Sequence, residues 1–270
     1  LYQRAYEISA RVHGEESPDT LLYLNNVGGM EEAQGKLAEA EKSYRRSMEG
    51  FIKVSGEDSL DALIGMNNVA SALDSLGRLD EAESLYRRSL EGRKRTLGRE
   101  HPSTLLALNN MAHFYMQRDR NAEAEAILRE GVNAAAAGLG EENPTTLTLR
   151  HNLSAALDRL GRSEESLAMT REVLEARTRV LGAEHEATIA TKRNLGRALI
   201  NAGQFADAER VLLEATETGT ASLPPGNVTR RTLAEAMVKL YEKWDEAEPG
   251  EGHGAKASPW REALASPEAG

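Results

Sequence analysis

The residues best able to do chemistry in this chain are six histidines. A metal or catalytic site would need them at fixed spacings beside other functional groups, but no HExxH motif is present. The absence of cysteine excludes thiolate zinc sites, disulfides and cysteine nucleophiles. The phosphate loops GxGxxG and GxxxxGK[ST] and the GxSxG nucleophile turn are also missing. We therefore expect no enzyme, bound metal or cofactor from His13, His101, His113, His151, His185 and His253.

Paired asparagines point to a different chemistry, because a side-chain amide both donates and accepts hydrogen bonds. A regular series of amides can hold an extended peptide backbone with little regard for its sequence. The first residue of each pair is a candidate ligand contact, whereas the second has an alternative role in bonding the backbone of a neighbouring repeat. The pairs recur every 42 residues as Asn25-Asn26, Asn67-Asn68 and Asn109-Asn110, followed by His151-Asn152 and Arg193-Asn194.

The elements that position these side chains follow the same 42-residue step. Apolar residues three and four apart, such as Leu63, Met66, Val69 and Leu73, predict an amphipathic helix that ends at Gly77. A second helix then runs to Gly98, so each repeat forms a helix pair. The small residues that would let the two helices approach closely are Ala40, Ala82, Ala124, Ser166 and Ala208. The turn glycines are Gly35, Gly77, Gly161 and Gly203, with Asp119 in the third place, where aspartate tolerates a left-handed conformation.

Composition narrows the class of partner. The 270 residues carry a net charge of −10, which argues against nucleic acid and anionic membranes as partners. No apolar run approaches the roughly 18 residues of a membrane span, and no signal peptide is in view. We therefore expect a cytoplasmic protein that binds neither nucleic acid nor membrane.

Two segments carry a family resemblance, GRLDEAESLYRRSLEGRKRTLG at 77–98 and LGREHPSTLLALNNMA at 97–112. They resemble the tetratricopeptide repeat, in the 42-residue form of kinesin light chains and of many bacterial signalling proteins. The resemblance implies an all-α, right-handed superhelical solenoid of antiparallel helix pairs, whose first helices line a concave groove. It also implies a protein or peptide partner. Kinesin light chains read cargo peptides that hold a tryptophan among acidic residues.

The repeat pattern divides the chain into three parts. Residues 1–12 are expected to form the second helix of a preceding partial repeat, and residues 13–223 to form five repeats. Residues 224–270 are expected to form a capping helix with a degenerate sixth repeat or a tail. Trp244 and Trp260 both lie there and would cover the last apolar face, as the ends of solenoids require.

The groove face gives the candidate ligand contacts. Basic residues concentrate in its later repeats, which would attract an acidic peptide to an otherwise acidic protein. The alternative is that these arginines pair with neighbouring glutamates. The candidate peptide-binding residues are Asn25, Asn67, Asn109, His113, His151, Arg159, Arg193, Arg197 and Asn201.

The sequence thus predicts a scaffold that binds a protein or peptide in its groove. A second hypothesis is a regulatory or sensor arm of a multidomain bacterial kinase or ATPase. Such an arm would contact an upstream domain of its own protein.

Overall fold

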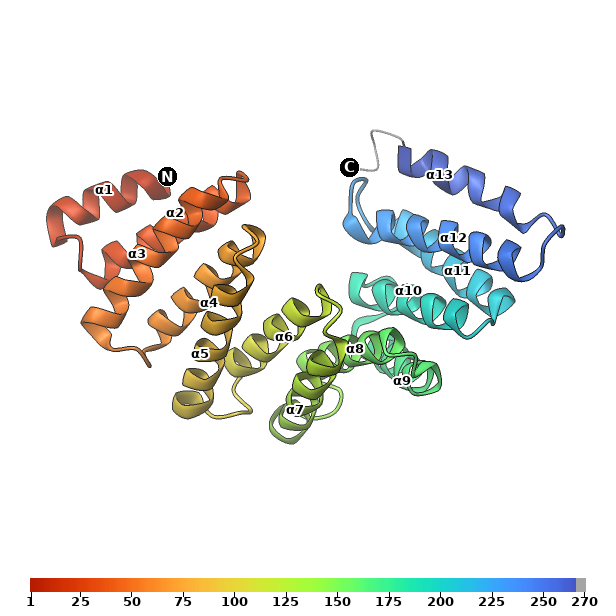
Figure 1. Cartoon of the computed structure of the whole chain (residues 1–270), viewed down its shortest axis with the longest axis horizontal. Coiled ribbons are helices and arrows are strands. Elements are labelled where there is room, and N and C mark those ends of the chain that lie inside the picture. Colours follow the sequence, from red (N-terminus) through yellow and green to blue (C-terminus); the bar gives the residue numbers. More distant parts are fainter. Residues whose placement is uncertain (266–270) are drawn as a thin grey trace. The chain divides into compact units, whose positions relative to one another are not determined.

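The computed structural model describes residues 1–265, in which thirteen α-helices and one short 3₁₀-helix follow one another (Figure 1). No strand occurs among the described residues, so the predicted all-α array of helix pairs is confirmed. The chain forms two compact units, unit 1 (residues 1–138) and unit 2 (residues 139–270), each described by itself below. In the described part of the chain, no helix has the length and apolar run needed to cross a bilayer.

Unit 1 consists of successive helices joined by short turns. Within it α2 packs on α3, α3 on α4, α4 on α5, and α5 on α6, so each helix covers its neighbours in the chain. Its helices are α1 (Tyr2–His13), α2 (Pro18–Ala33), α3 (Leu37–Ser55), α4 (Leu60–Ser75), α5 (Leu79–Leu97), α6 (Pro102–Met116) and α7 (Asn121–Leu139).

Unit 2 continues the pattern but ends differently. After two regular pairs, a 20-residue helix is followed by a five-residue turn, a 3₁₀-helix and a short last helix. Its helices are α8 (Pro144–Arg159), α9 (Ser163–Leu181), α10 (Glu186–Asn201), α11 (Phe205–Ser222), α12 (Val228–Ala247), η1 (His253–Ala257) and α13 (Ser258–Ala265).

Side chains in the inter-repeat loops fix where the first helices begin. Ser59 Oγ accepts a hydrogen bond from the Ala62 amide, which satisfies one of the free N–H groups at the start of α4. His101 and His185 cap the starts of α6 and α10 in the same way. Their Nδ1 atoms accept hydrogen bonds from the Ser103 and Ala187 amides, each at 3.1 Å. These two histidines are therefore helix caps and belong to no chemical site.

A left-handed residue ends the first helix of most pairs. Gly77 has φ 76°, a conformation that costs a residue with a Cβ atom about 1–2 kcal/mol. In the third repeat Asp119 takes this place with φ 55°, and it is the sole non-glycine residue with positive φ among the described residues. The prediction of a left-handed aspartate at this turn is confirmed.

Small residues set the distance between the helices of a pair. Ala82 is completely buried, as are Ala40, Ala124 and Ala208 at the equivalent positions. At Gly92 a Cβ atom would overlap a methyl carbon of Leu63, so α5 passes α4 more closely than a residue with a side chain allows. Beside it, Ser89 Oγ donates to the Leu63 carbonyl at 2.7 Å, which satisfies a buried hydroxyl.

Both tryptophans lie against the apolar core of unit 2, as the sequence predicted. Trp244 stacks between Phe205 and His253, with ring centroids 5.9 Å and 4.0 Å away. Trp260 of α13 packs on the same cluster, whose centre includes the fully buried Met237. The C-terminal helices thereby cover apolar side chains of α10 and α11.

Candidate functional site

A polar groove of about 950 Å³ lies between α4 and α6 of unit 1. Amide, hydroxyl and imidazole groups make up most of its lining, so it is suited to hydrogen bonding with a ligand. Three predicted contacts, Asn67, Asn109 and His113, lie in it. The lining residues are Asn67, Ser71, Asp74, Ser75, Leu79, Tyr86, Asn109, Asn110, His113, Gln117 and Arg118.

The asparagine pairs form hydrogen bonds from repeat to repeat. Asn68 Nδ2 donates to Asn25 Oδ1 at 2.9 Å, and Asn110 Nδ2 donates to Asn67 Oδ1 at 3.2 Å. The second asparagine thus bonds a side chain of the preceding repeat, and our alternative of a backbone partner was wrong for these two pairs. Within the described part of the chain, Asn25 and Asn67 use no other hydrogen bond, so their Nδ2 groups remain available as donors to a ligand carbonyl.

The acidic side chains of the early groove are engaged within the fold. Glu32 accepts hydrogen bonds from Tyr44 at 2.9 Å and from Ser71 at 3.3 Å. Burial, with the neighbouring Glu32, raises the pKa of Tyr44, so its hydroxyl stays protonated and donates. Asp74 forms an ion pair with Arg118. Arg118 thus offsets the charge of Asp74, whereas Glu32 keeps its negative charge because its two donors are neutral hydroxyls.

Three contributors to this groove lie outside the first-helix pattern on which the sequence prediction rested: Leu79, Tyr86 and Arg118. Leu79 and Tyr86 belong to a second helix, whose residues we expected to pack inward or face away from the groove. Arg118 follows the end of α6 and carries no repeat signal. Its partner Asp74 lies 44 residues earlier, and a search for opposite charges about one repeat apart would have found the pair.

His151 of unit 2 takes the place of an asparagine and keeps its hydrogen-bonding role. Its Nε2 lies 3.0 Å from Asn194 Nδ2, and its Nδ1 lies 3.4 Å from Thr191 Oγ1. Burial and the nearby guanidinium groups of Arg177 and Arg193 lower the pKa of His151 to about 3. The ring is therefore neutral at pH 7 and supplies no positive charge to the groove.

Arg177 is a buried cation of unit 2 that has no carboxylate partner among the described residues. Its guanidinium donates to the Ala187 carbonyl at 3.0 Å and to the hydroxyls of Thr191 and Thr148 at 2.9 and 3.1 Å. Burial lowers its pKa to about 10, so it remains charged at neutral pH. This buried charge raises the positive potential next to His151 and the start of α10.

The predicted basic residues of α10 lie one turn apart. Arg193 is half-buried and donates to Thr232 at 2.6 Å and to Asn194 at 3.2 Å, while its Nε is buried without a partner. Burial, and then the charge of Arg197, lower the pKa of Arg193. Arg197 is half-buried beside a small hollow that also contains Asp158. Two like charges are thus held together on one face of this helix.

The remaining predicted contacts of unit 2 have different surroundings. Asn201 is exposed, and its Nδ2 donates to both carboxylate oxygens of Asp158 at 2.9 Å. Arg159 is exposed at the end of α8. No group of three His, Asp or Glu side chains that could hold a metal ion occurs among residues 1–265.

Comparison with solved structures places this fold among known repeat proteins. A putative kinesin light chain repeat protein of Podospora anserina is 23% identical, with a TM-score of 0.67 over 77% of this chain and 98% of that one. BtubC (BKLC) of P. vanneervenii is 18% identical, with a TM-score of 0.69 over 82% of this chain and 87% of the other. The apo form of RapI is 13% identical, with a TM-score of 0.75 over 98% of this chain and 68% of that one.

These identities show a shared fold. No significant match is found among curated protein sequences. The sequence profile of the tetratricopeptide repeat matches residues 1–53, 23–95, 61–112, 103–179 and 159–220, which together span most of the chain. With the helix pairs, the turn residues and the 42-residue period described above, this match shows that the chain belongs to the tetratricopeptide repeat family.

Proposed function

We propose that this array is a binding scaffold without catalytic activity, and that it holds a protein or peptide segment along the groove faces of its first helices. A related fold supports a peptide ligand, because a Rap protein, 12% identical with a TM-score of 0.62, was solved in complex with Competence and Sporulation Factor. In this chain the polar groove of unit 1 offers amide donors at a constant repeat step. Such donors suit the carbonyl groups of an extended polypeptide.

The ligand that we propose for unit 2 is an acidic peptide segment. The observation that carries this proposal is the pair Arg193 and Arg197, which lie on consecutive turns of α10 and form no direct ion pair with a carboxylate among the described residues. Glu235 is the carboxylate that acts on Arg193, and it only partly offsets the effects of burial and Arg197 on the pKa of Arg193. Many other arginines of the chain do form such pairs, for example Arg95 with Asp58 at 2.6 Å. Two adjacent cations that oppose each other in the free protein would be stabilised by a carboxylate ligand.

Peptide display against the purified chain, followed by affinity measurement by fluorescence anisotropy, tests the proposal. We expect enrichment of peptides rich in aspartate and glutamate. Arg197→Gln should weaken a selected peptide by about tenfold, because it removes a charge from a half-buried contact. The affinity of the unmodified chain should also fall as salt increases.

Arg171→Gln is the matched control, since Arg171 is an exposed arginine of the second helix α9 in the same unit. It should leave the affinity unchanged. Selection of neutral or basic peptides would contradict the acidic-ligand proposal while leaving a peptide scaffold in place. If display enriches no peptide, an intramolecular partner, as in the sensor-arm hypothesis, becomes the better explanation.

A further inference from the structure

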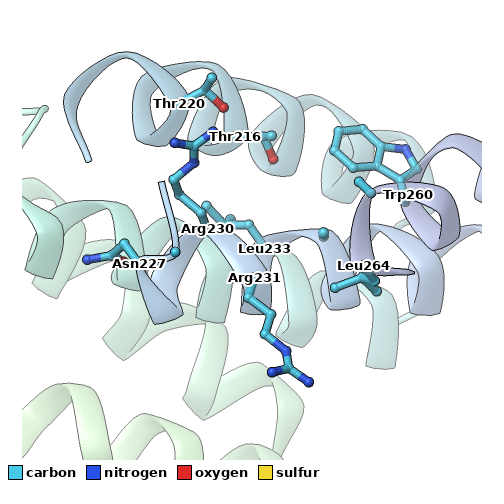
Figure 2. Close-up of a pocket in the computed structure, with 11 residues that line it drawn as sticks. Thr216, Thr220, Asn227, Arg230, Arg231, Leu233, Trp260 and Leu264 are labelled. Carbon is cyan, nitrogen blue, oxygen red and sulfur yellow. The ribbon is translucent and has the colours of Figure 1, made fainter. Parts of the chain in front are cut away.

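A separate cavity of about 260 Å³ lies in unit 2, between α11 and the α12–α13 pair (Figure 2). The cavity exists because the last helix pair, α12 with α13, has a longer connection than the regular pairs. Three or four residues separate the two helices of each regular pair, whereas the five residues 248–252 separate α12 from η1, and α13 begins only at Ser258. Within the described residues α13 then runs for only eight residues, so the N-terminal half of α12 stays uncovered opposite α11.

The two ends of this cavity have different chemistry. Figure 2 shows Trp260 and Leu264 of α13 at one end, and the Arg230 side chain extending from α12 toward Thr220 of α11 at the other. Leu233 of α12 is fully buried and closes the apolar side. The lining therefore combines an indole and two leucines with two guanidinium groups, two threonine hydroxyls and the amide of Asn227.

The Arg230 guanidinium is a charged group without a strong partner among the described residues. Among the described residues, the Arg230 guanidinium forms one hydrogen bond, a long contact of 3.4 Å to the Leu223 carbonyl, and it forms no ion pair. Thr220 on the facing helix makes no hydrogen bond there either. Its neighbour Arg231 also lines the cavity, but it is exposed and pairs with Glu235 at 3.3 Å, and its side chain extends in the opposite direction to that of Arg230 in Figure 2.

We propose that this cavity binds a small monocarboxylic acid with an aromatic or branched apolar body. The carboxylate would accept hydrogen bonds from Arg230 and Thr220, and the apolar body would lie against Trp260, Leu233 and Leu264. Charge-assisted bonds from a guanidinium to a carboxylate are among the strongest in proteins. The volume is near the lower end of the roughly 300–1,000 Å³ of ligand pockets, which fits one ring or one branched chain. This site is independent of the peptide groove proposed above.

Titration of the full chain with 3-phenylpropionate, followed by two-dimensional NMR and calorimetry, tests this inference. The indole N–H signal of Trp260 should shift, while that of Trp244, whose Nε1 is bonded to Glu248 at 3.0 Å, should stay in place. The neutral 3-phenylpropanamide has the same apolar body and should bind at least about tenfold more weakly. Equal binding of acid and amide would overturn the proposal, as would an unmoved Trp260 signal.

Two arginine variants locate the carboxylate. Arg230→Gln should lower the affinity for the acid to that of the amide. Arg210→Gln, at an exposed arginine of α11 outside the cavity lining, should leave the affinity unchanged. An equal loss of affinity in both variants would indicate a general effect of the net charge and would contradict a carboxylate site at Arg230. A chain that ends at Ala265 keeps all the lining residues and should bind equally well. Acid binding that appears only after this truncation would overturn the proposal, because the cavity would then be filled by the chain itself.

Discussion

At the residue scale, the most informative side chains are those that link one repeat to the next. Asn25 and Asn67 accept from asparagines 43 residues later, and His151 receives the equivalent contact from Asn194. Each link uses one acceptor of the groove residue. Asn25 and Asn67 keep their Nδ2 donors and one lone pair of Oδ1, whereas both ring nitrogens of His151 have partners within the fold, so the three positions are not equivalent as candidate ligand contacts.

His151→Asn should make the stability of unit 2 less sensitive to acid. The folded chain holds the pKa of His151 at about 3, whereas a free histidine has about 6.5, so the unfolded chain takes up a proton first as the pH falls. This contribution to stability is complete above pH 6.5 and is lost as the pH falls toward 3. At pH 5 the loss for one such histidine approaches about 2 kcal/mol.

Asparagine is the matched replacement because it occupies this position in the first three repeats and can accept from Asn194. Urea denaturation of both proteins at pH 7 and pH 5 gives the two free energies of unfolding. The decrease between these pH values should be smaller in the variant. An identical decrease in both proteins would show that His151 is already protonated in the folded chain or does not titrate in this range.

At the element scale, small residues decide how closely two helices pack. Ala82→Leu should destabilise the chain by about 1–3 kcal/mol, because Ala82 has no exposed surface and a larger side chain must displace its neighbours. Ser84→Leu on the exposed side of the same helix should change stability by less than about 0.5 kcal/mol. Thermal melting followed by circular dichroism measures both. A similar melting temperature for Ala82→Leu and the parent chain would exclude a tight helix contact there.

We expect the turn after α6 to be the weakest turn of the series. Asp119→Gly should raise the free energy of unfolding by about 1 kcal/mol, because glycine adopts the observed φ of 55° without the steric cost of a Cβ atom. Asp119→Ala, which keeps the Cβ atom and removes the carboxylate, should give no gain. Chemical denaturation of the three proteins measures the difference. A gain in the alanine variant equal to that in the glycine variant would assign the effect to the carboxylate and not to the backbone.

At the scale of the whole molecule, the C-terminal helices are needed to complete unit 2. Leu233, Met237 and Leu240 of α12 are fully buried in the same cluster as Ile189 and Leu212. A chain that ends at Val228 removes the first three and exposes the other two, so we expect a lower melting temperature and aggregation. Hydrogen exchange should speed up in α10 and α11 and stay slow in α3 and α4. Unchanged exchange in α10 and α11 would show that residues 229–270 are dispensable.

The sequence by itself determined the repeat. A 42-residue period in glycines, alanines and asparagines can be read directly from the chain, and the glycines and alanines act through their own backbone or the nearest helix. Gly77, Ala82 and Asp119 could therefore be assigned their conformation or burial without coordinates. The histidine caps also act at short range, because His101 and His185 bond amides only two residues away, but the sequence analysis did not predict them.

Tertiary structure alone decided which polar groups remain for a ligand. The charge of His151 depends on burial and on Arg177, 26 residues away in another helix, and Asp74 is neutralised by a residue one repeat later. Among the described residues, the cavity beside Arg230 arises because α13 begins late and covers only part of α12, a consequence of packing that no periodic pattern encodes. Burial and pairing are properties of several helices together, which is why a single repeat read in isolation could not reveal them.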